Sequence, residues 1–335
     1  MLKPLLFAAL IALPLPVWAE TPVTDTAIDT YILPGFATLA DATRRMAETA
    51  QTDCSPDSEP LRNAWGLAFD HWVSVSHLRF GPTERDSRAF ALAFWPDSRA
   101  KTPKALQQMI AGTDPIITTP GGVASLSIAA RGFYALEYLL YDPAFRSDPT
   151  YGCALIRALS ADIASTSHAI SQDWHDSYAA LMKTPGEGYS PYHTTEEVRQ
   201  ELFKALATGL QFTSDTRLGR PLGTFDRPRA KRAEARRSGR SQHHVVLSLQ
   251  SLRELSLILS VGDDRLTADV TGAFDLAVAQ AIALEDPVFA GVDDPSDRLE
   301  IEILQQTIDL IRDEQLANIG AKLGVAAGFN ALDGD

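Results

Sequence analysis

The segment Gly132-Phe133-Tyr134-Ala135-Leu136-Glu137 lies inside an apolar pattern that predicts a helix from about Ala124 to Tyr141. Glu137 is the only carboxylate in that segment. Tyr134 and Glu137 are three positions apart and therefore share one face of the predicted helix. Gly132 has no side chain, so the sequence predicts that another backbone segment approaches the helix at this point.

A carboxylate among apolar residues must be paired, protonated or bound to a cation, because an isolated buried charge is very costly. Two interpretations of Glu137 follow. In the first, it is a structural residue that forms a salt bridge with an arginine of a neighbouring helix. In the second, it lies at a binding site.

The rest of the chain predicts an all-α fold. Its 335 residues suggest two domains, and amphipathic helical patterns dominate while strand signals are weak. The turn-rich segment Thr184-Pro185-Gly186-Glu187-Gly188 is the best candidate for a domain boundary. We therefore expect two antiparallel helical bundles, an N-terminal one over residues 20–186 and a C-terminal one over residues 187–335.

The first 19 residues have the pattern of a secretory signal peptide. Lys3 precedes an apolar run from Leu5 to Leu13, and the small-residue site ends at Ala19, where cleavage is expected. The sequence thus predicts an exported protein of the bacterial periplasm. No later segment has eighteen unbroken apolar residues, so no membrane span is expected. The net charge of −13 makes nucleic acid an unsuitable partner.

Cys54 and Cys153 are the only cysteines, an even number in a compartment expected to be oxidising. We predict that they form a disulfide. Two free buried thiols are the alternative.

Several familiar chemical motifs are absent from the sequence. It has no His-Glu-x-x-His, no Gly-x-Ser-x-Gly, no phosphate-binding Walker loop and no Glu-x-x-His pair of the di-iron type. His243 and His244 are adjacent, so they diverge on a helix and do not easily bind the same ion. The irregular basic stretch from Arg217 to Arg240 is either a solvated loop or a source of guanidinium groups that hold a carboxylate or another anion.

Five parts of the sequence resemble the imelysin-like proteins, and these parts share their order along the chain with that family. Residues 132–140 resemble that family's Gly-x-His-x-x-Glu helix. The other parts are Trp72 with Arg79-Phe80-Gly81-Pro82, then Phe94-Trp95-Pro96-Asp97, Glu234 to Ser241, and Leu323 to Asn330 with Asp333-Gly334-Asp335. The resemblance implies two helical bundles related by a pseudo-twofold axis, with the motif helix lining a cleft between them. It also implies a periplasmic or envelope protein associated with bacterial iron uptake, in a family named for a proposed metallopeptidase activity.

The chain departs from the family motif because Tyr134 replaces the histidine. A phenol binds metal only when it is deprotonated, chiefly to ferric iron, whereas imidazole is a good neutral ligand for zinc or iron. Tyr134 and Glu137 are therefore candidate ligands for a ferric ion, or Tyr134 donates an ordinary hydrogen bond in the cleft. The cofactor, if any, is expected to be iron or another divalent or trivalent metal.

We therefore predict a periplasmic imelysin-like binding or accessory protein for iron uptake, with no catalytic residues, that uses the cleft between the bundles. Its expected partners are a metal ion or small ligand and envelope components of iron uptake. A metallopeptidase of the imelysin type and a metal-free peptide- or glycan-binding module are the alternatives. The expected site residues are Tyr134, Glu137, His77, Arg79, Trp95, Asp97, Arg240 and Ser241.

Overall fold

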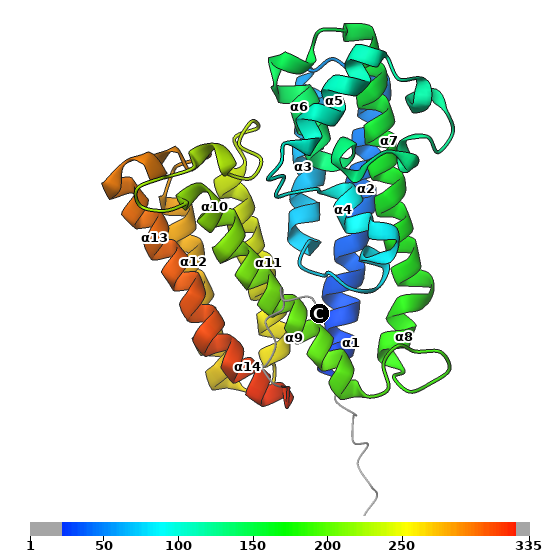
Figure 1. Ribbon diagram of the computed structural model, residues 1–335. Helices are drawn as coiled ribbons and strands as arrows, with labels where there is room; N and C mark the ends of the chain where they lie inside the picture. The colour runs from blue at the N-terminus through cyan, green and yellow to red at the C-terminus, as the bar shows by residue number, and fades with distance from the viewer. Residues whose placement is uncertain (1–21, 326–335) are drawn as a thin grey trace, which may run out of the picture.

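The computed structural model describes residues 22–325. The expected signal peptide and the closing Asp333-Gly334-Asp335 lie outside the described residues. Between Pro22 and Val325 the chain forms helices and turns, with an isolated bridge between Thr224 and Arg227 and no strand. The all-α prediction is confirmed, and Figure 1 shows two groups of helices side by side.

The first group, here called the N-terminal half, contains three long helices and four shorter ones among the described residues. The long helices are α2 (Leu33–Thr52), α3 (Glu59–Val75) and α7 (Pro149–Asp173). The shorter helices are α4 (Arg88–Leu92), α5 (Lys101–Gly112), α6 (Gly132–Tyr141) and α8 (Ala179–Lys183).

The second group, here called the C-terminal half, has six helices. They are α9 (Thr195–Gln211), α10 (Gly219–Leu222), α11 (Ser241–Ser260), α12 (Asp264–Ala283), α13 (Pro295–Leu310) and α14 (Leu316–Leu323). The first helix of the chain, α1 (Val23–Ala27), contacts α9 and α11, although it precedes the N-terminal half in sequence. In the described part of the chain, π-helical segments extend neighbouring helices at Ile28–Ile32, Trp174–Tyr178, Phe212–Leu218 and Ile311–Gln315.

Local sequence signals explain where two of the helices begin. The Ser58 hydroxyl accepts a hydrogen bond from the Leu61 N–H at 3.3 Å, which caps α3. At α9, the Thr194 hydroxyl accepts from the Glu197 N–H at 3.3 Å, and the Glu197 carboxylate accepts from the His193 N–H at 2.6 Å. These reciprocal contacts resemble the capping box that the sequence predicted.

The helix that carries Glu137 is shorter than the sequence predicted, because it begins at Gly132 rather than near Ala124. Residues Val123–Ser125 and Ile128–Ala130 form separate 3₁₀ turns. Gly132 has a positive φ of 78°, and a Cβ atom there would lie 2.2 Å from the Leu92 carbonyl oxygen. Only glycine fits this position, so the close backbone approach fixes the start of α6.

Helices α3 and α11 form the main contact between the two halves. Close to it, the ring of Phe69 on α3 stacks on Phe133 of α6, with centroids 4.7 Å apart, and meets His244 of α11 edge-on. The predicted disulfide between Cys54 and Cys153 is present, and it joins the segment after α2 to α7 within the N-terminal half.

Among the described helices, α12 is long and apolar enough to cross a membrane by length and composition alone. It carries Asp269 and Asp275, and it packs against α11 and α13 in the C-terminal half. These contacts are those of a bundle helix with one exposed face.

Candidate binding site between the two halves

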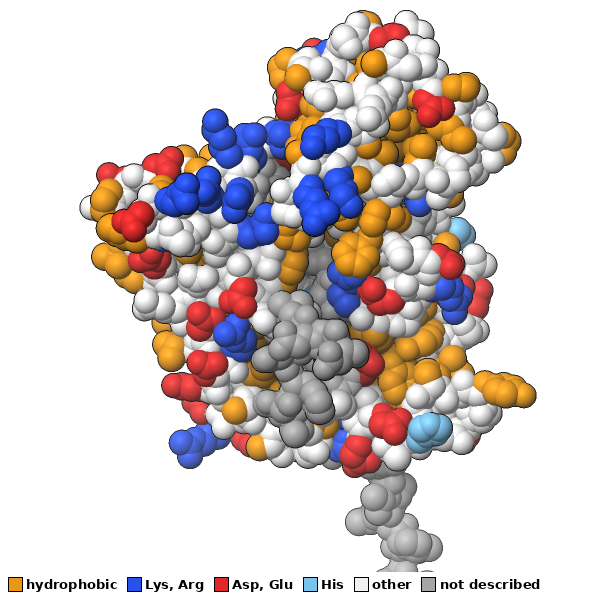
Figure 2. Space-filling model, viewed as in Figure 1, with side chains coloured by type: hydrophobic (Ala, Val, Ile, Leu, Met, Phe, Trp, Pro, Cys, Tyr) orange, Lys and Arg blue, Asp and Glu red, His pale blue; other side chains and the backbone are white. Residues whose placement is uncertain are grey.

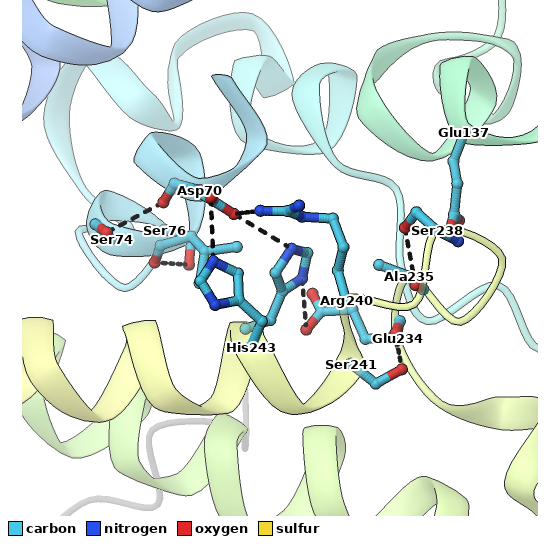
Figure 3. Close-up of polar contacts among 12 residues, drawn as sticks. Asp70, Ser74, Ser76, Glu137, Glu234, Ala235, Ser238, Arg240, Ser241 and His243 are labelled. Carbon is cyan, nitrogen blue, oxygen red and sulfur yellow. Dashed lines mark hydrogen bonds and ion pairs between the residues drawn. The ribbon is translucent and has the colours of Figure 1, made fainter. Parts of the chain in front are cut away.

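Glu137 lies at the interface between the halves and is almost fully buried, with 2% of its surface exposed. Its Oε1 atom accepts hydrogen bonds from the Ser238 backbone N–H at 3.0 Å and from the Ser238 hydroxyl at 2.9 Å. Figure 3 shows Glu137 reaching from α6 toward the loop that carries Ser238. Burial raises the pKa of Glu137, and the two Ser238 hydrogen bonds offset part of that shift.

The neighbouring Tyr134 contacts a second buried carboxylate. Its hydroxyl donates to Glu234 Oε1 at 2.5 Å, and the other carboxylate oxygen accepts from Arg217 Nε at 2.7 Å. Burial opposes ionisation of Glu234, but Arg217, His244 and Tyr134 together lower its pKa to about 2. Burial and the Glu234 charge both raise the pKa of Tyr134, so this residue stays a neutral phenol.

A third carboxylate, Asp70 on α3, contacts basic side chains at the start of α11. Arg240 pairs with one of its oxygens, and His243 Nε2 lies 3.1 Å from the other (Figure 3). A Cβ at Gly66 would lie 2.9 Å from Arg240 Nη1, so glycine makes room for this guanidinium. His244 is fully buried between Glu234 and Asp70, at 3.5 and 4.0 Å, and burial lowers its pKa.

A cavity of about 160 Å³ lies beside Glu137 and Tyr134 and is lined by both halves. The N-terminal half contributes the segment around Trp95 and Asp97 together with one face of α6. The C-terminal half contributes Arg220 and the loop from Lys231 to Arg237. The cavity therefore corresponds to the cleft that the sequence led us to expect between two bundles.

The charge of this cavity is predominantly positive. Five basic side chains line it, compared with the two acids Asp97 and Glu137. The basic residues are Arg220, Lys231, Arg232, Arg236 and Arg237. Figure 2 shows Lys and Arg side chains gathered over the upper part of the C-terminal half and the adjoining edge of the N-terminal half.

The structure brings four of the eight predicted site residues to the cavity: Tyr134, Glu137, Trp95 and Asp97. The Asp97 carboxylate already accepts from the backbone N–H groups of Arg99, Lys101 and Thr102. It therefore anchors the start of α5 as well as lining the cavity.

Two more predicted residues, Arg240 and Ser241, do not line the cavity and follow, in sequence, the loop that does. Arg240 pairs with Asp70, and the Ser241 hydroxyl donates to the Glu234 backbone carbonyl. Both residues fasten the basic loop to its surroundings.

The remaining two predicted residues lie elsewhere. His77 is buried, its Nε2 lies 3.0 Å from the Tyr31 hydroxyl, and burial lowers its pKa to about 3. Arg79 pairs with Glu84, and its guanidinium lies over the ring of Phe90 at 4.7 Å from the centroid.

Sequence reasoning missed the residues that the C-terminal half places at the interface. Glu234, Arg217 and Ser238 belong to a basic, irregular stretch in which no periodic pattern marks one residue above another. One signal was available, because Glu234 is the only acid between Asp226 and Glu254. An acid alone among so many arginines suggests a specific ion pair.

The donor groups of the site do not match the ferric pair that the sequence suggested. The Tyr134 hydroxyl donates a hydrogen bond to Glu234, and the raised pKa of Tyr134 disfavours the phenolate that would bind ferric iron. Within residues 22–325 no group of three His, Cys, Asp or Glu side chains is arranged to hold a metal ion.

Comparisons with known proteins agree with this architecture. In its fold, the chain is similar to an imelysin-like protein from Psychrobacter arcticum 273-4, with a TM-score of 0.74 and 17% identity over 92% of this chain and 99% of that one. It is also similar to a protein from Parabacteroides distasonis ATCC 8503, provisionally named an iron-regulated protein A precursor, with a TM-score of 0.76 and 14% identity over 93% and 98% of the two chains.

In sequence, the chain is 21% identical over 207 residues to iron-regulated protein A of Synechococcus elongatus. That match covers 59% of this chain and 54% of the relative, so it spans about half of the relative's length. The family model described as imelysin, peptidase M75, matches residues 32–315. The chain therefore belongs to the imelysin family.

Proposed function

We propose that this protein is an exported binding protein of iron acquisition, which takes its ligand in the cavity between its two halves. The cavity carries the proposal, because both halves contribute to it and because the buried Glu137 and Tyr134 form part of its wall. Ligand sites commonly occur at such interfaces, where a few polar groups converge in a concave surface.

Two further observations support an iron-related role and export. The relatives from Synechococcus elongatus and Parabacteroides distasonis are named as iron-regulated proteins. The first 19 residues have the composition of a secretory signal, which supports export to the periplasm.

Growth and localisation test the physiological part of the proposal. A strain without the gene is expected to grow more slowly than its parent when iron is scarce and equally well when iron is plentiful. Cell fractionation is expected to find the mature chain in the periplasm, with its N-terminus at Glu20. Equal growth under iron limitation, or retention in the cytoplasm, would contradict the proposal.

A binding experiment tests the cavity itself. Calorimetric titration with ferric citrate is expected to give saturable binding to the wild-type protein and weaker binding to Glu137→Ala. The matched control is Glu300→Ala, which removes an exposed carboxylate of α13 and should bind like the wild type. Identical curves for the wild type and Glu137→Ala would exclude Glu137 from the site. Chelator-sensitive cleavage of peptides would instead indicate a metallopeptidase.

A further inference from the structure

We infer that the cavity recognises a compact polyanion with at least two negatively charged oxygen groups, so that iron enters as an anionic chelate rather than as a bare ion. The presence of iron in the ligand rests on the proposed function. The recognition of an anion is argued from the charges of the cavity alone. Carboxylate and phosphate groups share this chemistry and are distinguished by the experiment below.

Four of the five basic side chains at the cavity have no counter-charge among the described residues. Within residues 22–325 no carboxylate oxygen lies within 4.0 Å of Arg220, Lys231, Arg232 or Arg236. The fifth, Arg237, is already paired with Asp142 at 3.0 Å, and its guanidinium covers the Tyr138 ring at 3.6 Å from the centroid. The cavity thus offers a group of cations that the protein's own acids leave uncompensated.

Arg220 is the most informative of these cations because it is half-buried. Its Nε atom is shielded from solvent and has no hydrogen-bond partner within the described part of the chain. The guanidinium lies over the ring of Trp95, with its Cζ atom 5.8 Å from the centroid. Burial and the neighbouring Arg232 charge both lower the pKa of Arg220. A shielded donor without an acceptor costs free energy, and an anion in the cavity would remove that cost.

The two acids of the cavity do not neutralise these cations. Glu137 accepts its hydrogen bonds from Ser238, and its raised pKa reduces its tendency to carry charge. Asp97 accepts three backbone N–H groups at the start of α5. A bare ferric ion in this cavity would meet uncompensated like charges, whereas an anionic chelate would meet donors suited to oxygen groups.

The size of the cavity restricts the ligand further. Its volume of about 160 Å³ is well below the roughly 300 Å³ at which pockets for drug-sized molecules begin. A small organic acid, a pyrophosphate-sized molecule or a compact iron complex of either is the appropriate class.

Isothermal titration calorimetry of the whole mature protein tests the inference with three probes: citrate, ferric citrate and inorganic pyrophosphate. At least one probe is expected to bind, with an affinity that falls as ionic strength rises. Tighter binding of the citrate probes would identify an organic-acid site, and tighter binding of pyrophosphate would identify a phosphate site. Arg220→Gln is expected to weaken binding about tenfold or more, the loss typical of one charged hydrogen bond.

The matched control is Arg227→Gln, which removes the same charge from an exposed residue of the same basic stretch that does not line the cavity. Its affinity should stay close to that of the wild type. Circular dichroism and the melting temperature establish that both variants are folded. The inference is overturned if none of the three probes binds, or if folded Arg220→Gln binds as tightly as the wild type.

The outcomes also separate this inference from the proposed function. If ferric citrate binds equally well to the wild type and Arg220→Gln while growth on scarce iron needs the gene, the inference fails and the function stands. If citrate or pyrophosphate binds through Arg220 while growth on scarce iron does not need the gene, the function fails and the inference stands.

Discussion

Two hollows lie where the halves of this protein meet, and they differ in chemistry more than in position. The cavity beside Glu137 has a volume of about 160 Å³ and five basic side chains. The second hollow, here called the α2–α11 groove, has a volume of about 410 Å³ and is lined by α2, α3, α11 and residues Thr30 and Tyr31. Among the described residues, the side chains with ionisable acid or base groups that line it are Tyr31, His71 and Glu254.

The hydroxyl groups of the α2–α11 groove are already hydrogen-bonded within the protein. Its hydroxyl groups donate to backbone carbonyl oxygens: Thr30 to Thr26, Thr38 to Pro34, Ser74 to Asp70, Ser251 to Ser74 and Tyr31 to Ser251. At the smaller cavity, by contrast, the Arg220 donor is shielded and has no described partner. The difference teaches that a group of unpaired cations with a shielded donor, rather than volume, marks the better candidate for a binding site.

Removal of the disulfide is expected to have the largest effect on stability. It should leave the chemical difference between the two hollows unchanged. Cys54 and Cys153 are 99 residues apart and line neither hollow. Replacing both with serine is expected to lower the free energy of unfolding by roughly 4–5 kcal/mol, because the unfolded chain gains conformational entropy. Urea denaturation measures this loss, and citrate binding by the folded variant should be unchanged. A large loss of affinity would mean that the cavity depends on the N-terminal half as a whole.

Glu234→Gln should be almost as destabilising, because it leaves Arg217 buried without its counter-charge. The expected loss is about 3–5 kcal/mol in urea denaturation. Glu196→Gln is the matched control, since it breaks an exposed pair with Arg199 and should cost about 1 kcal/mol or less. Equal effects of the two changes would show that the ion pair beneath the basic cavity has no special structural role.

Glu234 also gives the protein an acid-sensitive interface. Its pKa in the folded protein is about 2, below the value of about 4.3 expected in the unfolded chain. The stabilisation is therefore complete above about pH 4.3 and is lost as the pH falls toward 2, because protonation is easier in the unfolded chain. Melting temperatures measured from neutral to acidic pH should fall in this range for the wild type. The fall should be smaller in Glu234→Gln, and identical profiles would contradict the assignment.

Glu137→Gln is expected to have a much smaller effect on stability, of about 1 kcal/mol or less. Burial raises the pKa of Glu137, so its charged form at neutral pH opposes folding, and the neutral amide removes that penalty. The glutamine carbonyl can still accept from Ser238. Urea denaturation at neutral pH should show unchanged or slightly higher stability. A loss comparable to that of Glu234→Gln would mean that Glu137 is a charged structural partner after all.

The smallest effect is expected in the α2–α11 groove. Glu254→Gln removes the only carboxylate that lines it within residues 22–325, and the free energy of unfolding should change by no more than about 0.5 kcal/mol. Citrate and pyrophosphate titrations should match those of the wild type. Weaker or stronger binding of these probes to Glu254→Gln would indicate that the anion binds in the larger hollow. The α2–α11 groove would then be the better candidate for the binding site.

Much of the fold could be predicted because the helical signals are local. Ser58 and Thr194 begin α3 and α9 as expected, since each side chain accepts from a backbone N–H three residues ahead. The beginning of α6 could not be predicted. It depends on the carbonyl oxygen of Leu92, which lies far from Gly132 in sequence. This oxygen approaches so closely that no residue with a Cβ atom fits at position 132.

The sequence by itself determined the helical class, the pairing of the two cysteines, and the exceptional position of Glu137 on an apolar helix. These properties follow from composition, local periodicity and residue count. Only the tertiary structure decided the partners of that carboxylate. Ser238 is 101 residues away from Glu137, and Glu234 is 100 residues away from Tyr134, in a stretch without periodic pattern. Such contacts depend on how the two halves pack, because a hydrogen bond or ion pair over that distance leaves no local trace in the chain.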